Sequence, residues 1–156
     1  MKNMILAVDP GKASGIACFT WEGDEPVLVW SGEYQPYEFA GPIASAILDA
    51  RLNGWSLDVA CESFTITPQT GKNSQAPYSL EQIGVLKHLL REGDYHEGTL
   101  HFQNPSDAKR MFTNDALKKL GYWHKGGEGH ALDSIRHGLL YLAKHGWTPR
   151  KLLEGY

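Results

Sequence analysis

The chain has 156 residues, of which 42% are hydrophobic and 11% aromatic, and its formal net charge is −3. This length and composition are typical of one globular domain; they exclude a disordered chain and argue against a strongly basic nucleic-acid coat protein. The two cysteines, Cys18 and Cys61, fall inside predicted strands and form no CxxC pair, so we expect buried thiols and no cysteine-based zinc site.

Three short apolar strands are predicted near the N-terminus, at about residues 4–9, 15–20 and 27–31. Because only short polar segments separate them, these strands should form an antiparallel meander. The first strand ends at Asp9, since Pro10 keeps the preceding residue extended and Gly11 permits a turn.

Helices and two further strands alternate through the rest of the chain. The spacing of apolar residues predicts helices over 39–53, 80–92 and 130–145, two helical pieces between Pro105 and Leu120, and strands over 57–62 and 99–103. A polar loop is expected over 65–79. This order predicts an α/β fold with a mixed five-stranded sheet, in which two strands join the meander through helical crossovers and helices cover both faces.

Charge is distributed unevenly along the chain. Residues 1–64 carry three basic and nine acidic groups, whereas residues 65–156 carry twelve basic and nine acidic groups. Between positions 109 and 125, five basic residues stand against Asp115 alone. This patch could face a phosphate backbone, and a solvated helix face is the alternative reading.

Export and membrane insertion are not expected. The apolar run over 4–8 is too short for a secretory signal and stops at a charged residue. No stretch approaches the roughly 18 apolar residues that a membrane span needs. We therefore expect a cytoplasmic protein without a membrane partner.

Four polar side chains stand at the ends of predicted apolar elements. Asp9 and Glu62 end strands, and their Cα atoms would lie about 5 Å apart if those strands were neighbours. His130 and Asp133 share a face at the start of the last helix, whose N-terminus should keep the imidazole neutral. Such a cluster repels itself unless a cation binds in it, which favours divalent-metal chemistry on a phosphate.

Each of these residues also has an ordinary structural interpretation when taken alone. Asp9 fits a turn, Glu62 fits an exposed strand end, His130 fits a helix start, and Asp133 fits a partner for the helix dipole. The metal site is predicted from the four together.

Four segments carry a resemblance to a known family. They comprise residues 5–11 with Gly15 following, residues 59–64, residues 104–110 and residues 130–134. In this order they resemble a RuvC-type Holliday-junction resolvase of the RNase H-like (retroviral integrase) superfamily. The resemblance implies one RuvC-like nuclease domain over 1–156, acting on four-way branched DNA in recombination and repair, in a bacterial or phage-infected cell.

The resemblance also implies a mechanism and an assembly. Two Mg²⁺ or Mn²⁺ ions would bind, with Asp9 bridging them, Glu62 on one side, and Asp133 with His130 on the other. The products would carry 5′-phosphate and 3′-hydroxyl ends. The enzyme would be a homodimer in which each subunit cuts one strand, and the helix over 80–92 occupies the position of the family's dimer helix.

The chain departs from the family at two places. Some members have aspartate at the position of His130, so metal preference is open. Residues 65–79 match the family poorly where relatives contact the junction centre, so the preferred substrate structure and cutting sequence are open as well.

Contacts to DNA are predicted mainly from the basic patch. The candidates for phosphate contacts are Lys109, Arg110, Lys118 and Lys119. Such contacts position a protein on DNA but do not recognise the base sequence. Lys72, in the polar loop, is either a further contact or a mobile surface lysine. Phe64 either stacks on a base or packs in the core. Trp123 and His124 are candidates to cover the substrate.

Three other functions are weighed. A less selective endonuclease would cut forks and flaps, and a junction-binding scaffold would bind without cutting. An ATP-dependent phosphotransferase of the actin and hexokinase type shares an Asp-x-Gly turn, but it duplicates the domain, and this chain is too short and has one such motif.

Overall fold

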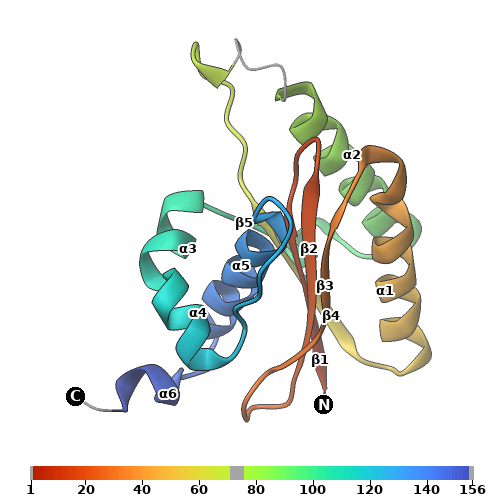
Figure 1. Ribbon diagram of the computed structural model, residues 1–156. Coiled ribbons are helices and arrows are strands. Elements are labelled where there is room, and N and C mark those ends of the chain that lie inside the picture. The colour runs from red at the N-terminus through yellow and green to blue at the C-terminus, as the bar shows by residue number, and fades with distance from the viewer. Residues whose placement is uncertain (1, 71–75, 155–156) are drawn as a thin grey trace.

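A computed structural model describes residues 2–70 and 76–154 and contains a five-stranded mixed sheet (Figure 1). The strands are β1 (Asn3–Asp9), β2 (Ser14–Trp21), β3 (Val27–Tyr34), β4 (Ser56–Glu62) and β5 (Leu100–Gln103), in the spatial order β3-β2-β1-β4-β5. The first three pair antiparallel, and β4 and β5 join parallel to β1. The predicted meander and crossovers are thus confirmed.

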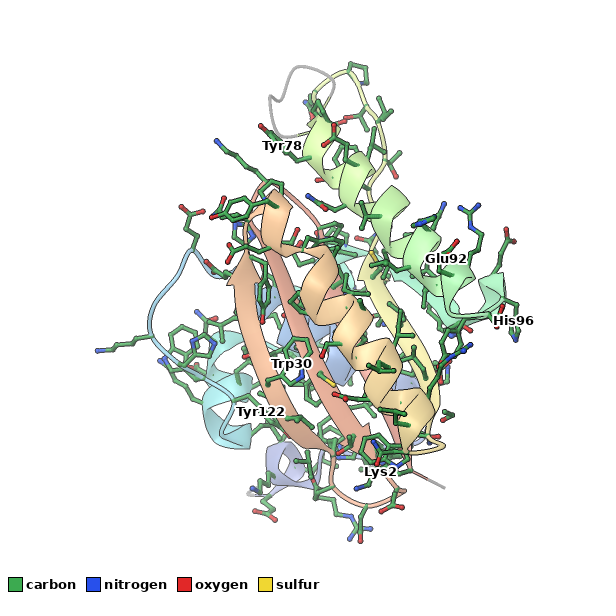
Figure 2. The ribbon with its side chains drawn as sticks, turned by 90° about the vertical axis from the view of Figure 1, so that its right-hand side faces the viewer. Lys2, Trp30, Tyr78, Glu92, His96 and Tyr122 are labelled. Atoms are coloured by element: carbon green, nitrogen blue, oxygen red, sulfur yellow. The ribbon has the colours of Figure 1, made fainter. Side chains whose placement is uncertain are left out.

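Helices cover both faces of the sheet. On one face lie α1 (Ala40–Leu52) and α2 (Ala76–Glu92), which Figure 2 shows crossing the near side of the strands. On the other face lie α3 (Pro105–Met111), α4 (Asn114–Leu120) and α5 (His130–Lys144), followed by α6 (Arg150–Leu153). Two single 3₁₀ turns, Pro36–Glu38 and Glu97–Thr99, precede α1 and β5.

The start of α2 differs from the predicted one. The segment that was expected to be loop up to residue 79 is helical from Ala76, and Pro77 is tolerated because it lies in the first turn of α2. The two helical pieces predicted after Pro105 are confirmed as α3 and α4; they are divided at Phe112 and Thr113, where the Thr113 hydroxyl accepts a hydrogen bond from the Ala116 amide and caps α4.

The core is divided between the two faces of the sheet. Alternating residues of β1 serve both sides: Leu6 and Val8 pack with α1 and α2, whereas Ile5 and Ala7 pack with α5. Cys18 and Cys61 are buried and unpaired, as expected. In the described part of the chain, no helix is long and apolar enough to cross a membrane.

Helix α5 packs unusually close to the sheet. Small side chains of the central strands lie beneath it, and a Cβ on Gly138 would stand 2.4 Å from the Phe19 ring. Residues 134–142 of α5 are all buried. This close packing fixes the start of α5 against the ends of the strands, where the candidate site lies.

Candidate active site

The site begins with a row of residues across the carboxyl ends of adjacent strands. Val8 is paired with Cys61, so the next residues, Asp9 and Glu62, are neighbours on β1 and β4. Glu62 is in turn paired with Gln103 on β5. Paired residues project to the same face of a sheet, and here that is the face covered by α5.

Gly15 allows the first turn of α5 to reach this row. Gly15 is paired with Asp9 across β2 and β1, and a Cβ on Gly15 would lie 1.8 Å from the carbonyl oxygen of His130. His130 is thereby held beside Asp9, with 3.3 Å between Nδ1 and Oδ2. The Glu33 carboxylate on β3 accepts hydrogen bonds from the amides of Glu128 (2.8 Å) and His130 (2.9 Å) and braces the turn.

Asp133 is held one helical turn further along α5. Its Oδ1 accepts a hydrogen bond of 2.8 Å from the Arg136 guanidinium. The same guanidinium donates to the Phe112 carbonyl (2.8 Å) and to the Asn114 side chain. Arg136 therefore links Asp133 to the junction between α3 and α4.

Glu62 is held by a histidine that lies deeper in the fold. His137 is 1% exposed, and its Nε2 lies 3.3 Å from Oε2 of Glu62. Each of the three carboxylates thus meets one basic side chain of α5: Asp9 meets His130, Glu62 meets His137, and Asp133 meets Arg136.

The carboxylates disturb one another's protonation. Burial raises the pKa of Asp9 from 3.8 to about 7; the negative charges of Glu62 and Asp133 add to this, and the hydrogen bond with His130 opposes it. Burial also acts to raise the pKa of Glu62, but hydrogen bonds from His137 and Asp9 outweigh it and hold the pKa below its ordinary value.

The expectation that His130 is neutral is wrong for the metal-free protein. The hydrogen bond to Asp9 raises the pKa of His130 to about 9 against the opposing effect of burial, and the charges of Glu33 and Asp133 contribute. The nearby carboxylates therefore outweigh the helix dipole, whose effect is limited to fractions of a kcal/mol at most exposed sites.

The donor set fits a hard divalent cation. Asp9, Glu62 and Asp133 offer carboxylate oxygens, which are the ligands that suit Mg²⁺ or Mn²⁺, and His130 adds an imidazole nitrogen, which is a softer donor. In the residues that the structure describes, no group of three or more His, Cys, Asp or Glu side chains is already arranged to hold a metal. Each of the three carboxylates is instead paired with a basic side chain of α5.

Two buried groups beside Glu62 support a ligand or solvent at this end of the sheet. Both polar atoms of the Gln103 side chain, and Nδ1 of His137, are buried without a hydrogen-bond partner among residues 2–70 and 76–154. Orphaned polar atoms are rare in folded proteins and commonly mark bound water or an ion.

The predicted DNA contacts lie at different distances from this cluster. Lys109 and Arg110 are exposed on α3, and Lys118 and Lys119 are exposed on α4. Lys109 is near enough for its charge to lower the pKa of Glu62. Arg110 forms an ion pair with Asp107 at 3.1 Å.

Two other candidates stand apart from the basic patch. Phe64 is half-buried and packs against the core on the side of α1 and α2, which favours the packing interpretation. Lys72 lies outside the described residues.

Sequence reasoning missed four residues of the site: Glu33, Gln103, Arg136 and His137. Helical spacing contained a signal for two of them, since residues 136 and 137 lie three and four positions after Asp133. Gln103 ends a strand as Asp9 and Glu62 do. Glu33 has no signal in the sequence, because its role depends on the distance between β3 and the turn before α5.

Comparison with known proteins identifies the fold. No family model matches the chain, and no curated protein matches it. The solved structure of T. thermophilus RuvC in complex with a Holliday junction substrate matches with a TM-score of 0.63 and 17% identity, over 92% of this chain and 96% of that chain. A second Thermus thermophilus RuvC structure matches with a TM-score of 0.60 at the same identity and coverage.

The chain therefore has the RuvC-type, RNase H-like fold, as the sequence motifs predicted. A structure of the Aquifex aeolicus PPX-GPPA enzyme matches more weakly, with a TM-score of 0.42 and 7% identity over 75% of this chain and 40% of that chain.

Proposed function

We propose that this protein is a divalent-metal-dependent endonuclease that resolves four-way DNA junctions. The observation that carries the proposal is the gathering of Asp9, Glu62 and Asp133 with His130 at one end of a RuvC-type sheet. A buried carboxylate such as Asp9, whose pKa is raised by burial and by the charges of Glu62 and Asp133, is typical of sites that bind cations. The T. thermophilus RuvC with the same fold was solved with a Holliday junction substrate.

Asp9, Glu62, His130 and Asp133 would hold two Mg²⁺ or Mn²⁺ ions. When bound, such a pair activates a water and stabilises both the attacking and the leaving oxygen of a phosphodiester. The products would be nicks with 5′-phosphate and 3′-hydroxyl ends.

The chain's other residues would keep the ligands in position. His137 fixes one oxygen of Glu62, and Arg136 fixes one oxygen of Asp133, so neither carboxylate is free to rotate. His130 would exchange its proton and its contact with Asp9 for a metal contact. The buried surroundings of Asp9, which is 9% exposed, limit the water that competes for the site.

We further propose a homodimer in which each subunit cuts one strand, with α2 at the interface. Helix α2 lies on the opposite face of the sheet from α5, and its first turn extends beyond the strand ends near Tyr78 (Figure 2). The Ser79 hydroxyl donates to the Pro10 carbonyl at 3.1 Å, which connects α2 to the turn after Asp9. We propose that the enzyme acts in recombination and repair in the cytoplasm of a bacterial or phage-infected cell.

Cleavage of synthetic branched DNA tests this proposal. Four-way, three-way and flap substrates are incubated with Mg²⁺ or Mn²⁺, and the product ends are mapped. Paired, symmetric nicks in the four-way junction with ligatable ends are expected, and Asp9→Asn should abolish them while junction binding is retained. Asp58→Asn is the matched control, since Asp58 lies on the same face of β4 but pairs with His101 at 3.2 Å.

The same assay separates the alternatives. Equal cutting of forks and flaps would indicate the less selective endonuclease. Tight junction binding without cutting under either metal would indicate a scaffold and refute the proposal.

A further inference from the structure

A groove opens directly beside the candidate active site. It has a volume of about 510 Å³ and lies between α3, α4, the turn before α5 and the first turns of α5. Its walls include Lys109, Asn114, Trp123, Leu132, Asp133 and Arg136. Asp133 belongs both to this groove and to the proposed metal site, so whatever fills the groove lies next to the reacting phosphate.

The walls of the groove combine three kinds of chemistry. Trp123 and Leu132 supply apolar surface, Asn114 supplies an amide, and Lys109 supplies a cation. A second cation stands above the aromatic ring, because Nζ of Lys118 lies 4.9 Å from the ring centroid of Trp123. An aromatic plane with flanking cations is the arrangement by which proteins bind single nucleotides of a strand.

The geometry also limits how the groove can hold its occupant. The Arg136 guanidinium donates hydrogen bonds to Asp133, Phe112 and Asn114, so the Asp133 carboxylate already offsets its charge. The cations that face an incoming phosphate are therefore Lys109 and Lys118, which are both exposed. Trp123 is half-buried against the core, and a base that stacks on its outer face would take the place that Nζ of Lys118 holds over the ring.

We propose that this groove binds one nucleotide of the cut strand, next to the scissile phosphate, with its base unstacked from the duplex and resting on Trp123. This inference rests on the proposed nuclease function and adds a subsite to it. Lys109 and Lys118 would contact the phosphates on either side of that nucleotide. Drawing the base out of the stack would expose the phosphodiester to the carboxylates and fix its position.

Fluorescence of a base analogue tests the subsite. The cleavage position is first mapped, and 2-aminopurine is then placed on either side of it in a four-way junction bound with Ca²⁺ in place of the catalytic metal. An unstacked 2-aminopurine brightens, and stacking on tryptophan quenches it. Wild-type protein should therefore give a signal at one flanking position that differs from the signal elsewhere in the junction.

Three variants define the expected result. Trp123→Ala should abolish the position-specific signal and slow single-turnover cleavage by roughly 5- to 150-fold, the range that base–aromatic stacking supports. Trp123→Phe, which keeps an aromatic plane, should restore most of both. Trp55→Ala is the control, because Trp55 is also half-buried with a lysine over its ring, Lys2 at 5.0 Å, but at the opposite end of β4.

The outcomes distinguish the two proposals. If the junction is bound and cut but Trp123→Ala behaves like Trp55→Ala, the nucleotide subsite is refuted and the nuclease function stands. If Trp123→Ala weakens binding to every duplex equally without a position-specific signal, the groove contacts only backbone and the proposal is likewise overturned. If wild-type protein neither binds nor cuts branched DNA, both proposals fall.

Discussion

Replacing Asp9 by asparagine should make the metal-free protein more stable while abolishing its response to metal. Asp9 is nearly buried beside Glu62 and Asp133, and its pKa is raised from 3.8 to about 7. A raised carboxyl pKa means that the folded state resists ionisation. Ionisation of Asp9 therefore lowers the free energy of unfolding. This loss is absent below pH 3.8, grows as the pH rises, and is complete above pH 7.

The size of the effect follows from the pKa shift. Each unit is equivalent to about 1.36 kcal/mol, so ionised Asp9 costs the metal-free fold about 4 kcal/mol at pH 8. The hydrogen bond with His130 opposes that cost and is already contained in the shifted pKa, so asparagine, which loses both the charge and this bond, gains the full difference. The net gain is therefore at most about 4 kcal/mol, which corresponds to a rise in melting temperature of up to roughly 8–16 °C for a chain of this size.

Thermal unfolding in EDTA and in MnCl₂, at pH 5 and pH 8, measures this effect. Asp9→Asn should unfold at a higher temperature than wild type in EDTA at pH 8, by a margin that shrinks at pH 5, where wild-type Asp9 is already protonated. Manganese should stabilise wild type and leave Asp9→Asn unchanged. Lower stability of Asp9→Asn in EDTA at pH 8, or equal stabilisation of both proteins by manganese, would refute the reasoning.

Three further predictions test the scaffold and the surface. Gly15→Ala should lower the free energy of unfolding by at least about 1–3 kcal/mol in chemical denaturation, because its Cβ would lie 1.8 Å from a carbonyl oxygen. Gly84→Ala is the control: this position has open space around it in α2, so the substitution should leave the free energy of unfolding unchanged or raise it. His137→Ala should weaken Mn²⁺ binding by about 10- to 100-fold in calorimetric titration, and His137→Gln should recover part of it; unchanged affinity in both would exclude a positioning role. Lys118→Gln and Lys119→Gln should each reduce the slope of log affinity against log salt concentration by about one, the loss of one phosphate contact, when junction binding is measured by fluorescence anisotropy. An unchanged slope would show that the lysine does not contact DNA.

The strand ends and their carboxylates were predictable because local chemistry determines them. Asp9 is followed by proline and glycine, which end a strand in almost any context, and Glu62 closes an apolar run that is long enough for one strand only. Helical spacing was enough to put His130 and Asp133 on one face. The pairing of β1 with β4 was a condition of the predicted approach of Asp9 to Glu62, and the structure meets it.

The partners of these carboxylates were not predictable, because they depend on how α5 is rotated over the sheet. His137 meets Glu62 only because Gly15 and Gly138 allow α5 to approach closely. The protonation of His130 was predicted wrongly for a related reason: the helix dipole can be inferred from the sequence, whereas the distances to Asp9 and its neighbours cannot.

Anomalous diffraction from crystals soaked in MnCl₂ tests most directly whether these side chains form a metal site. Manganese peaks are expected between the side chains of Asp9, Glu62, His130 and Asp133, about 3.5–4 Å apart if two ions bind together, and Asp9→Asn crystals should lose them. A well-ordered crystal in which manganese occupies other positions and leaves these four side chains without a peak would contradict the account.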